Sequence, residues 1–251
     1  MIANRAQNIS PFIVMEVMEK AAGMEKQGTE IIHLEVGEPD FPVPECVAAA
    51  VGEAFAHGRT HYTHSLGDLD LREELVRRYA SEYGVEISAG QIMITSGSSP
   101  GILLALGVLC NPGDEVILSD PGYACYPNFI RFLGAKGVPV PVFEEDGFQY
   151  RPEKICREIT GKTKAIIINS PMNPTGNLMP VEVMKELARF DIPLVSDEIY
   201  HGLVYEGRAH SMLEFSGNTF VINGFSKLFA MTGLRLGYVI APPEFIRPMQ
   251  K

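Results

Sequence analysis

The 251-residue sequence lacks several features that mark particular classes of protein. Its four cysteines contain no C-x-x-C pair, and the chain is too long for a small disulfide-stapled fold, so we expect a reduced, cytoplasmic protein. The N-terminus lacks the long apolar core of a signal peptide, and no apolar run approaches the ~18 residues that span a bilayer. We therefore expect no membrane partner.

Basic charge is also scarce. The sequence has 21 lysine and arginine residues against 31 aspartate and glutamate residues, which gives a formal charge of −10. This surplus of negative charge argues against nucleic acid and against an anionic membrane surface as partners.

Motifs for metal or nucleotide binding are incomplete. His57, His61 and His64 lie close together, but Gly58 disfavours a helical ligand pair and no Glu or Cys completes the set, so we expect no metal site. The "GKTK" run at 161–164 resembles a phosphate-binding P-loop, but Cys156 stands where that motif needs a glycine. The sequence also has no Ser-His-Asp order with a nucleophile elbow.

The N-terminal third is predicted to be mainly helical. Helices are expected at 10–27, where Ser10 would cap the first turn, and at 44–55 and 69–84. Between the first two, residues 31–44 are expected to form a short strand and then an extended proline-rich loop.

From Gln91 onward, short apolar runs alternate with helices. The hydrophobic content of 46% is enough for a sizeable core. The runs do not alternate polar with apolar residues, so both faces of each strand should be buried. We therefore predict an α/β fold with a mostly parallel sheet sandwiched by helices. The six runs are "QIMITSG", "EVILSDPG", "KAIIINSPMNPTG", "IPLVSDEIY", "TFVINGFSK" and "LGYVIAP".

Five of the six runs end in polar loops that contain Gly, Pro or charged residues. In open α/β sheets, ligands bind at the carboxyl ends of the strands. We therefore expect one shared rim, formed by Ser96–Ser99, Asp120–Tyr123, Asn169–Gly176, Asp197–Tyr200 and Ser226–Lys227.

The side chains on this rim suit one cofactor. An amine, a carboxylate, an amide, two phenols and a guanidinium together fit pyridoxal 5'-phosphate (PLP). Lys227 would form the Schiff base and carry the proton between the substrate Cα and the cofactor. Arg235, eight residues later, would favour the deprotonated amine. Asp197 would keep the pyridine nitrogen protonated.

The remaining rim residues have matching tasks. Asn173 and Tyr200 could hydrogen-bond the ring oxygen, and Tyr123 could stack on the ring face. A helix that opens at Ser98–Ser99 would receive the phosphate on its N–H groups, with Ser226 and the guanidinium completing the cup.

Each of these signals also has an ordinary structural interpretation. A lysine after a serine is usually a solvated loop residue, Asp197 at a strand end is often a helix N-cap, and "NPTG" forms a type I turn. Their order carries more weight than any one of them. Asp197 follows Asn173 by 24 residues, Lys227 follows after 30 more, and Arg235 after a further 8.

Several blocks resemble those of one protein family across nearly the whole chain. "NSPMNPTG", "SDEIYHGLVYEG" and "GFSKLFAMTGLRLGYVIAP" are similar to the signature blocks of class I/II aminotransferases, which are fold type I PLP enzymes. "LEVGEPDFPVP" and "HYTHSLGDLDLREELVRRY" resemble N-terminal blocks of the same family.

The resemblance implies the same roles for the rim residues and adds two more. Tyr62 matches a tyrosine that reaches the phosphate of the neighbouring subunit, which implies a homodimer, and Gly37 matches a glycine beside the substrate carboxylate. The cofactor-binding residues implied by the resemblance are Gly97, Ser98, Ser99, Tyr123, Asn173, Asp197, Tyr200, Ser226, Lys227, Arg235 and, from the neighbour, Tyr62; of these Lys227, Asp197 and Tyr200 would be catalytic.

The resemblance also implies a division of the chain. Residues 1–40 would form an N-terminal arm and part of a small domain, and residues 41–251 the PLP-binding large domain. The family carries a further C-terminal segment with an arginine that binds the substrate carboxylate, whereas this chain stops at "EFIRPMQK". We therefore expect a truncated chain with an incomplete small domain.

The function implied is transamination between an amino acid and a 2-oxo acid. Two alternatives stay open at this point. One is other PLP-dependent chemistry, such as that of a C–S lyase or a decarboxylase. The other is a truncated, non-catalytic PLP-binding module.

Overall fold

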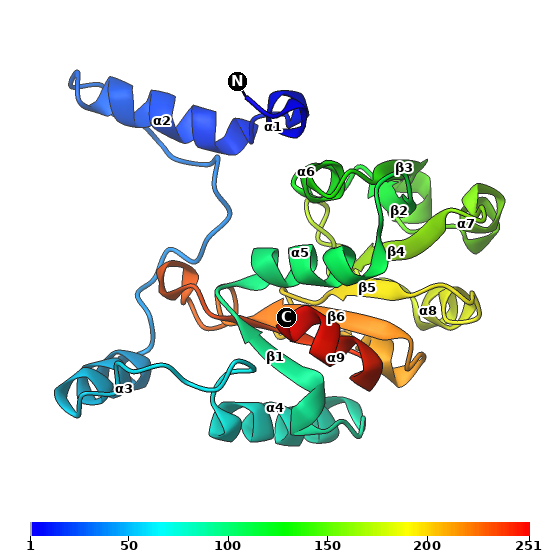
Figure 1. Cartoon of the computed structure of the whole chain (residues 1–251). Coiled ribbons are helices and arrows are strands. Elements are labelled where there is room, and N and C mark those ends of the chain that lie inside the picture. Colours follow the sequence, from blue (N-terminus) through cyan, green and yellow to red (C-terminus); the bar gives the residue numbers. More distant parts are fainter. Residues whose placement is uncertain (1) are drawn as a thin grey trace.

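The computed structural model describes residues 2–251, which form a β-sheet between two layers of helices (Figure 1). The helices are α1 Asn4–Asn8, α2 Ile13–Glu25, α3 Glu45–Ala56, α4 Leu69–Tyr83, α5 Ser98–Leu109, α6 Tyr126–Phe132, α7 Pro152–Glu158, α8 Val181–Leu187 and α9 Pro243–Gln250. Short 3-10 helices are η1 Ala89–Gln91, η2 Glu144–Asp146, η3 Met212–Glu214 and η4 Thr232–Leu234. The strands are β1 Ile92–Thr95, β2 Glu115–Asp120, β3 Lys136–Pro141, β4 Thr163–Asn169, β5 Leu194–Asp197, β6 Thr219–Gly224 and β7 Gly237–Ile240.

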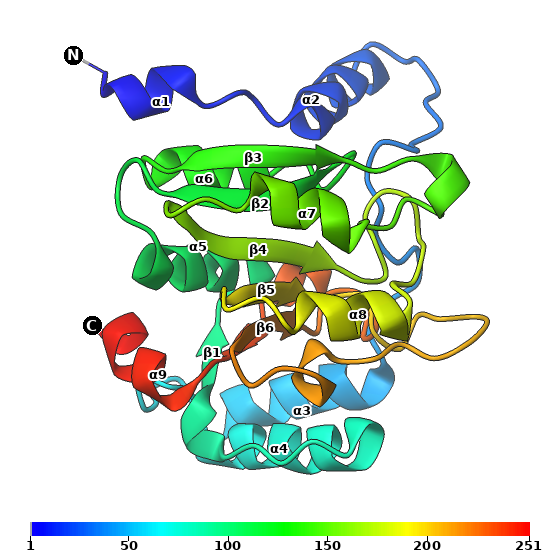
Figure 2. The same ribbon diagram turned by 90° about the vertical axis from the view of Figure 1, so that its right-hand side faces the viewer.

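The strands form a seven-stranded sheet in the order β1-β7-β6-β5-β4-β2-β3. Neighbouring strands from β6 to β3 run parallel, whereas β7 is antiparallel to both β6 and β1. The predicted mostly parallel sheet is therefore confirmed. In Figure 2, α7 and α8 lie in front of the strands and α5 lies behind them.

Both faces of the sheet are buried, as the unbroken apolar runs predict. On one face Ile167 and Ile222 pack with residues of α5, α6 and α9. On the other face Ile166 packs with residues of α7 and α8, and Val221 packs with residues of α4. Successive strand residues therefore point into opposite cores, which is the period-2 geometry of a strand.

Some predictions from the sequence are wrong. Residues 31–34 form no strand, and Ile32 and Leu34 are 85% and 88% exposed. The helix expected from residue 10 begins at Ile13 without a side-chain cap. Ser10 instead contacts α6, where its carbonyl accepts a hydrogen bond from Asn128 Nδ2 at 2.9 Å. Residues 31–34 stay outside the sheet because an apolar run becomes a strand only when a neighbouring strand satisfies its backbone N–H and C=O groups.

The sequence patterns also did not predict strand β3 or the short helices α1, α6, α7 and α9. The β3 run, "KGVPVP", carries Pro139 and Pro141, which lack a backbone N–H. It is tolerated because β3 lies at the edge of the sheet and pairs on one side only, with β2. None of the helices described within residues 2–251 combines the length and apolar character needed to cross a membrane.

The N-terminal elements stand away from the sheet. Figure 1 shows α1 and α2 at one end of the molecule, joined to α3 by an extended segment. Helix α2 buries Ala21, and α3 has no buried residue. The division of the chain at residue 40 stays a prediction.

Helix α5 approaches the sheet closely because two glycines leave room for it. A Cβ added to Gly237, the first residue of β7, would lie 2.6 Å from the carbonyl carbon of Gly97 and 2.8 Å from the amide nitrogen of Ser98. A Cβ on Gly101 of α5 would lie 2.8 Å from Val239 Cγ2. Real Cβ contacts are longer than this, so the start of α5 is held against β7 by the absence of side chains.

Replacing Gly237 by alanine should therefore destabilise the fold by about 1–3 kcal/mol, because the new methyl group must displace backbone atoms in a packed region. Thermal unfolding of the variant measures this loss. Gly161→Ala is the matched control, because Gly161 is exposed and an added Cβ there meets no atom within 4 Å. Equal transition midpoints for the two variants would contradict the close-approach argument.

Candidate active site

The carboxyl ends of the parallel strands lie along one edge of the sheet. Asn169, the last residue of β4, pairs in register with Asp197, the last residue of β5, and Asp197 pairs with Ile222 near the end of β6. Five loops expected to share a rim therefore leave the sheet at this edge. The rim residues are joined by a series of contacts that begins at Asp197.

Asp197 is a buried carboxylate, only 4% exposed. Its Oδ2 accepts a hydrogen bond from the Tyr126 hydroxyl at 2.8 Å, and its Oδ1 accepts one from the amide of Ile199 at 3.2 Å. Burial raises the pKa of Asp197 to about 6, and the two hydrogen bonds oppose that rise. The carboxyl group is thus largely ionised at neutral pH although it lies out of water.

Asn169 connects Asp197 to the loop that follows β4. Its side-chain Nδ2 donates to the carbonyl of Asp197 at 2.9 Å, and its Oδ1 accepts from the amide of Asn173 at 2.6 Å. Asn173 Nδ2 then donates to the hydroxyl of Tyr200 at 3.1 Å. The amide and the phenol expected to act together are therefore in contact.

Lys227 lies three residues beyond the end of β6. Its ammonium group donates to the carbonyl of Gly37 and lies 6.0 Å from the centroid of the Tyr200 ring. Burial lowers the pKa of Lys227, the charge of Arg235 lowers it further, and the carboxylate of Glu38 opposes both. The environment of Lys227 therefore favours a neutral amine, with burial contributing more than the arginine.

The start of α5 forms a tight contact with Arg235. Gly97 has φ +100°, and a Cβ built on it would lie 2.4 Å from Arg235 Nη2, so this position requires glycine. Arg235 itself adopts the left-handed region with φ 53° and donates from Nη1 to the carbonyl of Thr232 at 2.7 Å. The guanidinium therefore lies against the backbone that leads into the helix N-terminus, where Ser98 and Ser99 form the first turn.

Other expected residues fall into two groups. Tyr123 is close to the site, since its ring meets that of Tyr126 edge-on with centroids 5.2 Å apart. Ser226 is buried at the end of β6. Tyr62 stands apart from these residues, with a fully exposed side chain between α3 and α4.

Sequence reasoning missed Tyr126 and Glu38, and it placed Asn169 on the rim without giving it a role. Tyr126 could have been suspected from its position, three residues after Tyr123 at the start of a helix. Asn169 is the last residue of an apolar run, and its role as a bridge depends on the neighbouring strand. Glu38 comes from the N-terminal segment, and no local pattern places that segment beside Lys227.

Residues 29–251 match the family model described as aminotransferase class I and II. The chain therefore belongs to the class I and II aminotransferase family.

Individual relatives are similar over the full chain. A (5-formylfuran-3-yl)methyl phosphate transaminase of Methanocaldococcus jannaschii is 46% identical, and the match covers 100% of this chain and 66% of the relative. An aspartate/prephenate aminotransferase of Thermus thermophilus is 39% identical, and the match covers 99% of this chain and 66% of that relative. The solved structure of a Thermus thermophilus aspartate aminotransferase with maleate superposes with a TM-score of 0.96 and 39% identity, covering 100% of this chain and 67% of that one. The chain thus spans about two thirds of the length of these relatives.

The contact between Tyr126 and Asp197 predicts a pH-dependent loss in Tyr126→Phe. Above the Asp197 pKa of about 6 the hydroxyl bonds a charged group, so its removal should cost about 1.5–3 kcal/mol of stability. Below that pKa the carboxyl is neutral and the loss should fall to about 0.5–1.5 kcal/mol. Chemical denaturation at about pH 5 and about pH 8 measures both values.

Tyr126→Phe should lose more stability at higher pH because the pKa of Asp197 is raised. Without the Tyr126 hydrogen bond the pKa of Asp197 rises further above its unfolded value, so stability is lost as the pH increases through the folded pKa. Tyr150→Phe is the control, because that hydroxyl donates to the neutral carbonyl of Ile167 at 2.9 Å. A Tyr126→Phe loss that is the same at both pH values would contradict the assignment.

Proposed function

We propose that this chain is a PLP-dependent aminotransferase that moves an amino group from an amino acid to a 2-oxo acid. The observation that carries the proposal is the pairing of Lys227, an amine with a lowered pKa, and Asp197, a buried carboxylate, on one rim of the sheet. The two are connected through Tyr200, Asn173 and Asn169. The names of the relatives support transamination over the other chemistries considered from the sequence.

The residues on the rim fit PLP in three respects. Asp197 accepts two hydrogen bonds from the protein, while a carboxylate offers about four lone-pair positions, so it can accept another from a protonated ring nitrogen. The Arg235 guanidinium beside Gly97 and the α5 N-terminus suit a phosphate group. Lys227 supplies the primary amine that an aldehyde requires.

PLP, when bound, supplies an aldehyde that condenses with an amine and a ring that withdraws electrons from the substrate Cα. Each protein group has a defined task beside it. Lys227 holds and moves the proton at Cα, which a neutral amine does better than an ammonium group. Asp197 keeps a proton on the ring nitrogen through its negative charge. Tyr200 and Asn173 would hold the ring oxygen with hydrogen bonds, and Tyr123 would hold the ring face.

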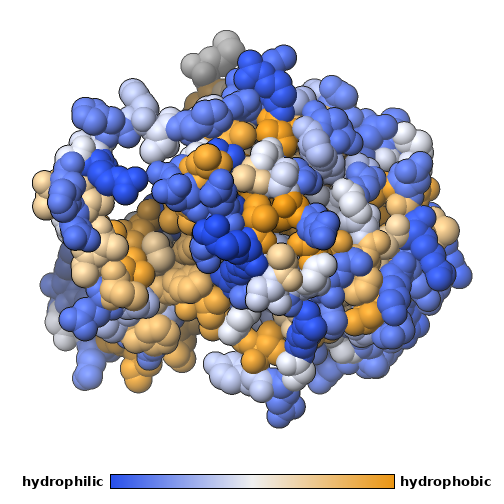
Figure 3. Space-filling model, turned by 90° about the horizontal axis from the view of Figure 1, so that it is seen from below, coloured by the Kyte–Doolittle hydropathy of each residue, from blue (hydrophilic) through white to orange (hydrophobic). Residues whose placement is uncertain are grey.

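The proposed assembly is a homodimer. Apolar side chains gather around a hollow where Figure 1 places α3 and the extended segment (Figure 3). Phe55 of α3 is 69% exposed, and Ile32 and Leu34 of the segment are more exposed still. Burial of such side chains against a second copy would remove them from water. The proposal also gives Tyr62 its contact with the phosphate of the neighbouring subunit and Gly37 its place beside the substrate carboxylate.

The cytoplasmic location expected from the cysteine pattern belongs to the same proposal. Cys46, Cys110, Cys125 and Cys156 are all free thiols in the structure. Free thiols are typical of proteins kept in a reducing compartment.

The proposal is tested first by trapping the cofactor. The protein is incubated with PLP and reduced with borohydride, and the modified peptide is then identified by mass spectrometry. We expect the label on Lys227 and its loss in Lys227→Ala, because only that amine combines a lowered pKa with a place on the rim. Lys185→Ala removes an exposed lysine of α8 and should label as the unmodified protein does. Full labelling of Lys227→Ala would overturn the assignment.

The role of Asp197 is tested by separating rate from affinity. In Asp197→Ala the rate of amino-group transfer from an amino acid to the bound cofactor should fall on the order of 100-fold or more, because a charge that stabilises the transition state is gone. The affinity for PLP should fall much less, since the phosphate contacts remain. Stopped-flow absorbance gives the rate and equilibrium titration the affinity, with exposed Asp191→Ala as control. A normal transfer rate would contradict the role.

A further inference from the structure

A second buried carboxyl group lies next to Asp197 in the chain, and the proposed reaction does not use it. Glu198 is 1% exposed and points to the α4 side of the sheet, opposite to Asp197. Its Oε1 accepts three hydrogen bonds: from the Ser196 hydroxyl at 3.0 Å, the Ser211 hydroxyl at 3.1 Å and the Met212 amide at 2.9 Å. Its Oε2, equally buried, has no hydrogen-bond partner among the described residues.

This asymmetry distinguishes the two oxygens. An ionised carboxylate accepts hydrogen bonds on both oxygens, whereas a neutral carboxylic acid has one acceptor-like oxygen and one hydroxyl. In Glu198 all the donors converge on Oε1. The arrangement is therefore that of a neutral acid whose proton is on Oε2.

The group that faces Oε2 supports the same conclusion. His201 is 2% exposed, and its Nδ1 lies 3.6 Å from Glu198 Oε2. His201 Nε2 lies 3.0 Å from the carbonyl of Ser170, which can only accept, so the ring proton is on Nε2. Nδ1 then carries a lone pair, toward which the Tyr83 hydroxyl donates at 2.8 Å. Because that single lone pair accepts the Tyr83 hydrogen bond, Nδ1 offers no donor to Glu198 Oε2, and a charged oxygen left buried without a donor would be costly.

An ion pair between Glu198 and His201 does not fit this geometry. Charge-assisted bonds of this kind span about 2.7–2.9 Å, and a buried ion pair is stable only when its geometry is close to ideal. The separation of 3.6 Å is too long for such a bond.

The charged groups around the pair favour two neutral partners. Burial, with a smaller contribution from the Asp197 carboxylate, raises the pKa of Glu198 to about 8, although the hydrogen bonds from Met212, Ser196 and Ser211 oppose that rise. Burial lowers the pKa of His201 to about 4, with Arg78 and His210 contributing. The other titratable groups that face the pair, from α4 and β7, are Tyr79, Tyr83 and Tyr238.

We propose that Glu198 is an un-ionised carboxylic acid beside a neutral His201, and that His201 positions the Ser170 carbonyl and through it the loop that carries Asn173. Ser170 lies between Asn169 and Asn173, so the hydrogen bond from His201 fixes this loop from the α4 side while Asn169 fixes it from the rim side. His201 is a positioning residue, and its effect on the cofactor site rests on the proposed function.

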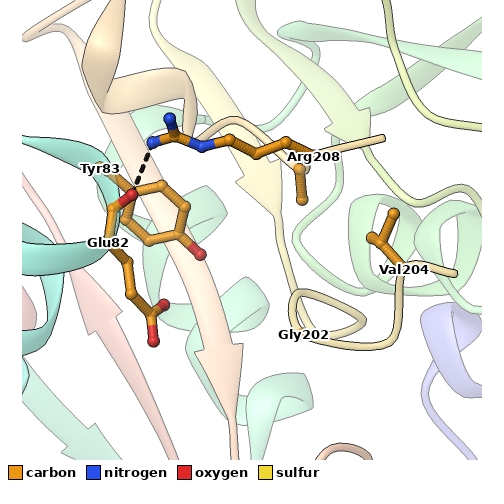
Figure 4. Close-up of a pocket in the computed structure, with 6 residues that line it drawn as sticks. Glu82, Tyr83, Gly202, Val204 and Arg208 are labelled. Atoms are coloured by element: carbon orange, nitrogen blue, oxygen red, sulfur yellow. Dashed lines mark hydrogen bonds between the residues drawn. The ribbon is translucent and has the colours of Figure 1, made fainter. Parts of the chain in front are cut away.

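Tyr83 connects this buried group to the surface. It lines a pocket of about 250 Å³ together with Glu82, Gly202 and Arg208, whose guanidinium donates to the carbonyl of Glu82 at 2.6 Å (Figure 4). The buried group is therefore linked by the Tyr83 hydroxyl to a residue that lines a surface pocket.

The protonation of Glu198 is tested on the full chain without added PLP. Infrared difference spectra between the protein and Glu198→Gln near neutral pH should show the loss of a protonated carboxyl band. Glu82→Gln, which removes an exposed carboxylate, should show the loss of an ionised band instead. Loss of an ionised band in Glu198→Gln would overturn the proposal.

Stability gives a second measure of the same proton. The folded pKa is raised, so between about pH 6.5 and 8 the folded protein keeps a proton that the unfolded chain has lost, and stability falls as the pH rises. Relative to Glu198→Gln, the folding equilibrium constant should fall by up to about tenfold per pH unit over this window. Parallel pH profiles for the two proteins would contradict a neutral Glu198.

The positioning role is tested with PLP bound. His201→Ala loses the donor to Ser170, whereas His201→Gln keeps an N–H at a similar reach. If Asn173 is displaced, the ring oxygen loses a donor and the pH midpoint of the cofactor absorbance change should rise by about 0.5–1 unit in His201→Ala and return in His201→Gln. An unchanged midpoint in folded His201→Ala overturns the positioning role. Failure of the unmodified protein to bind PLP would overturn the proposed function but leave the carboxyl measurements valid.

Discussion

The structure depends on keeping one negative charge out of water at the end of a central strand. Asp197 closes β5, where parallel neighbours on both sides leave little solvent, and burial raises its pKa to about 6. A buried carboxylate is tolerated only when donors surround it. Tyr126 supplies one from α6 and the Ile199 amide another, so the position of α6 on the sheet and the charge of the site are linked.

The two acids of the "SDEIY" segment are neighbours in the chain but lie in different surroundings. Asp197 is the last residue of β5 and contacts Tyr126 of α6, whereas Glu198, just beyond the strand, lies on the side of α4. Two charges on adjacent buried residues would repel, and the repulsion is relieved when one of them is protonated. Oxygen contacts determine which one: Asp197 accepts on both oxygens, and Glu198 on one.

Much of the architecture could be predicted because its signals are local. Unbroken apolar runs such as "KAIIIN" identify buried parallel strands, and the rule that ligands bind at their carboxyl ends gathers Asn173, Asp197 and Lys227 on one rim without coordinates. What could not be predicted depends on distant partners. The segment around Ile32 has the residues of a strand but no neighbour to pair with, and Glu38 reaches Lys227 from nearly two hundred residues away in the chain. Tyr126 lies in a short helix, whose few turns give little periodic signal.

The glycines at the start of α5 and of β7 link the packing of the fold to the geometry of the site. The start of α5 lies directly against β7, and that approach is possible because Gly101 and Gly237 carry no side chain. The same absence at Gly97 lets the Arg235 guanidinium lie on that backbone, which brings its positive charge to the helix end whose dipole also attracts anions. Close packing at Gly97 and Gly237 therefore brings a guanidinium charge and the positive end of a helix dipole to one point of the rim.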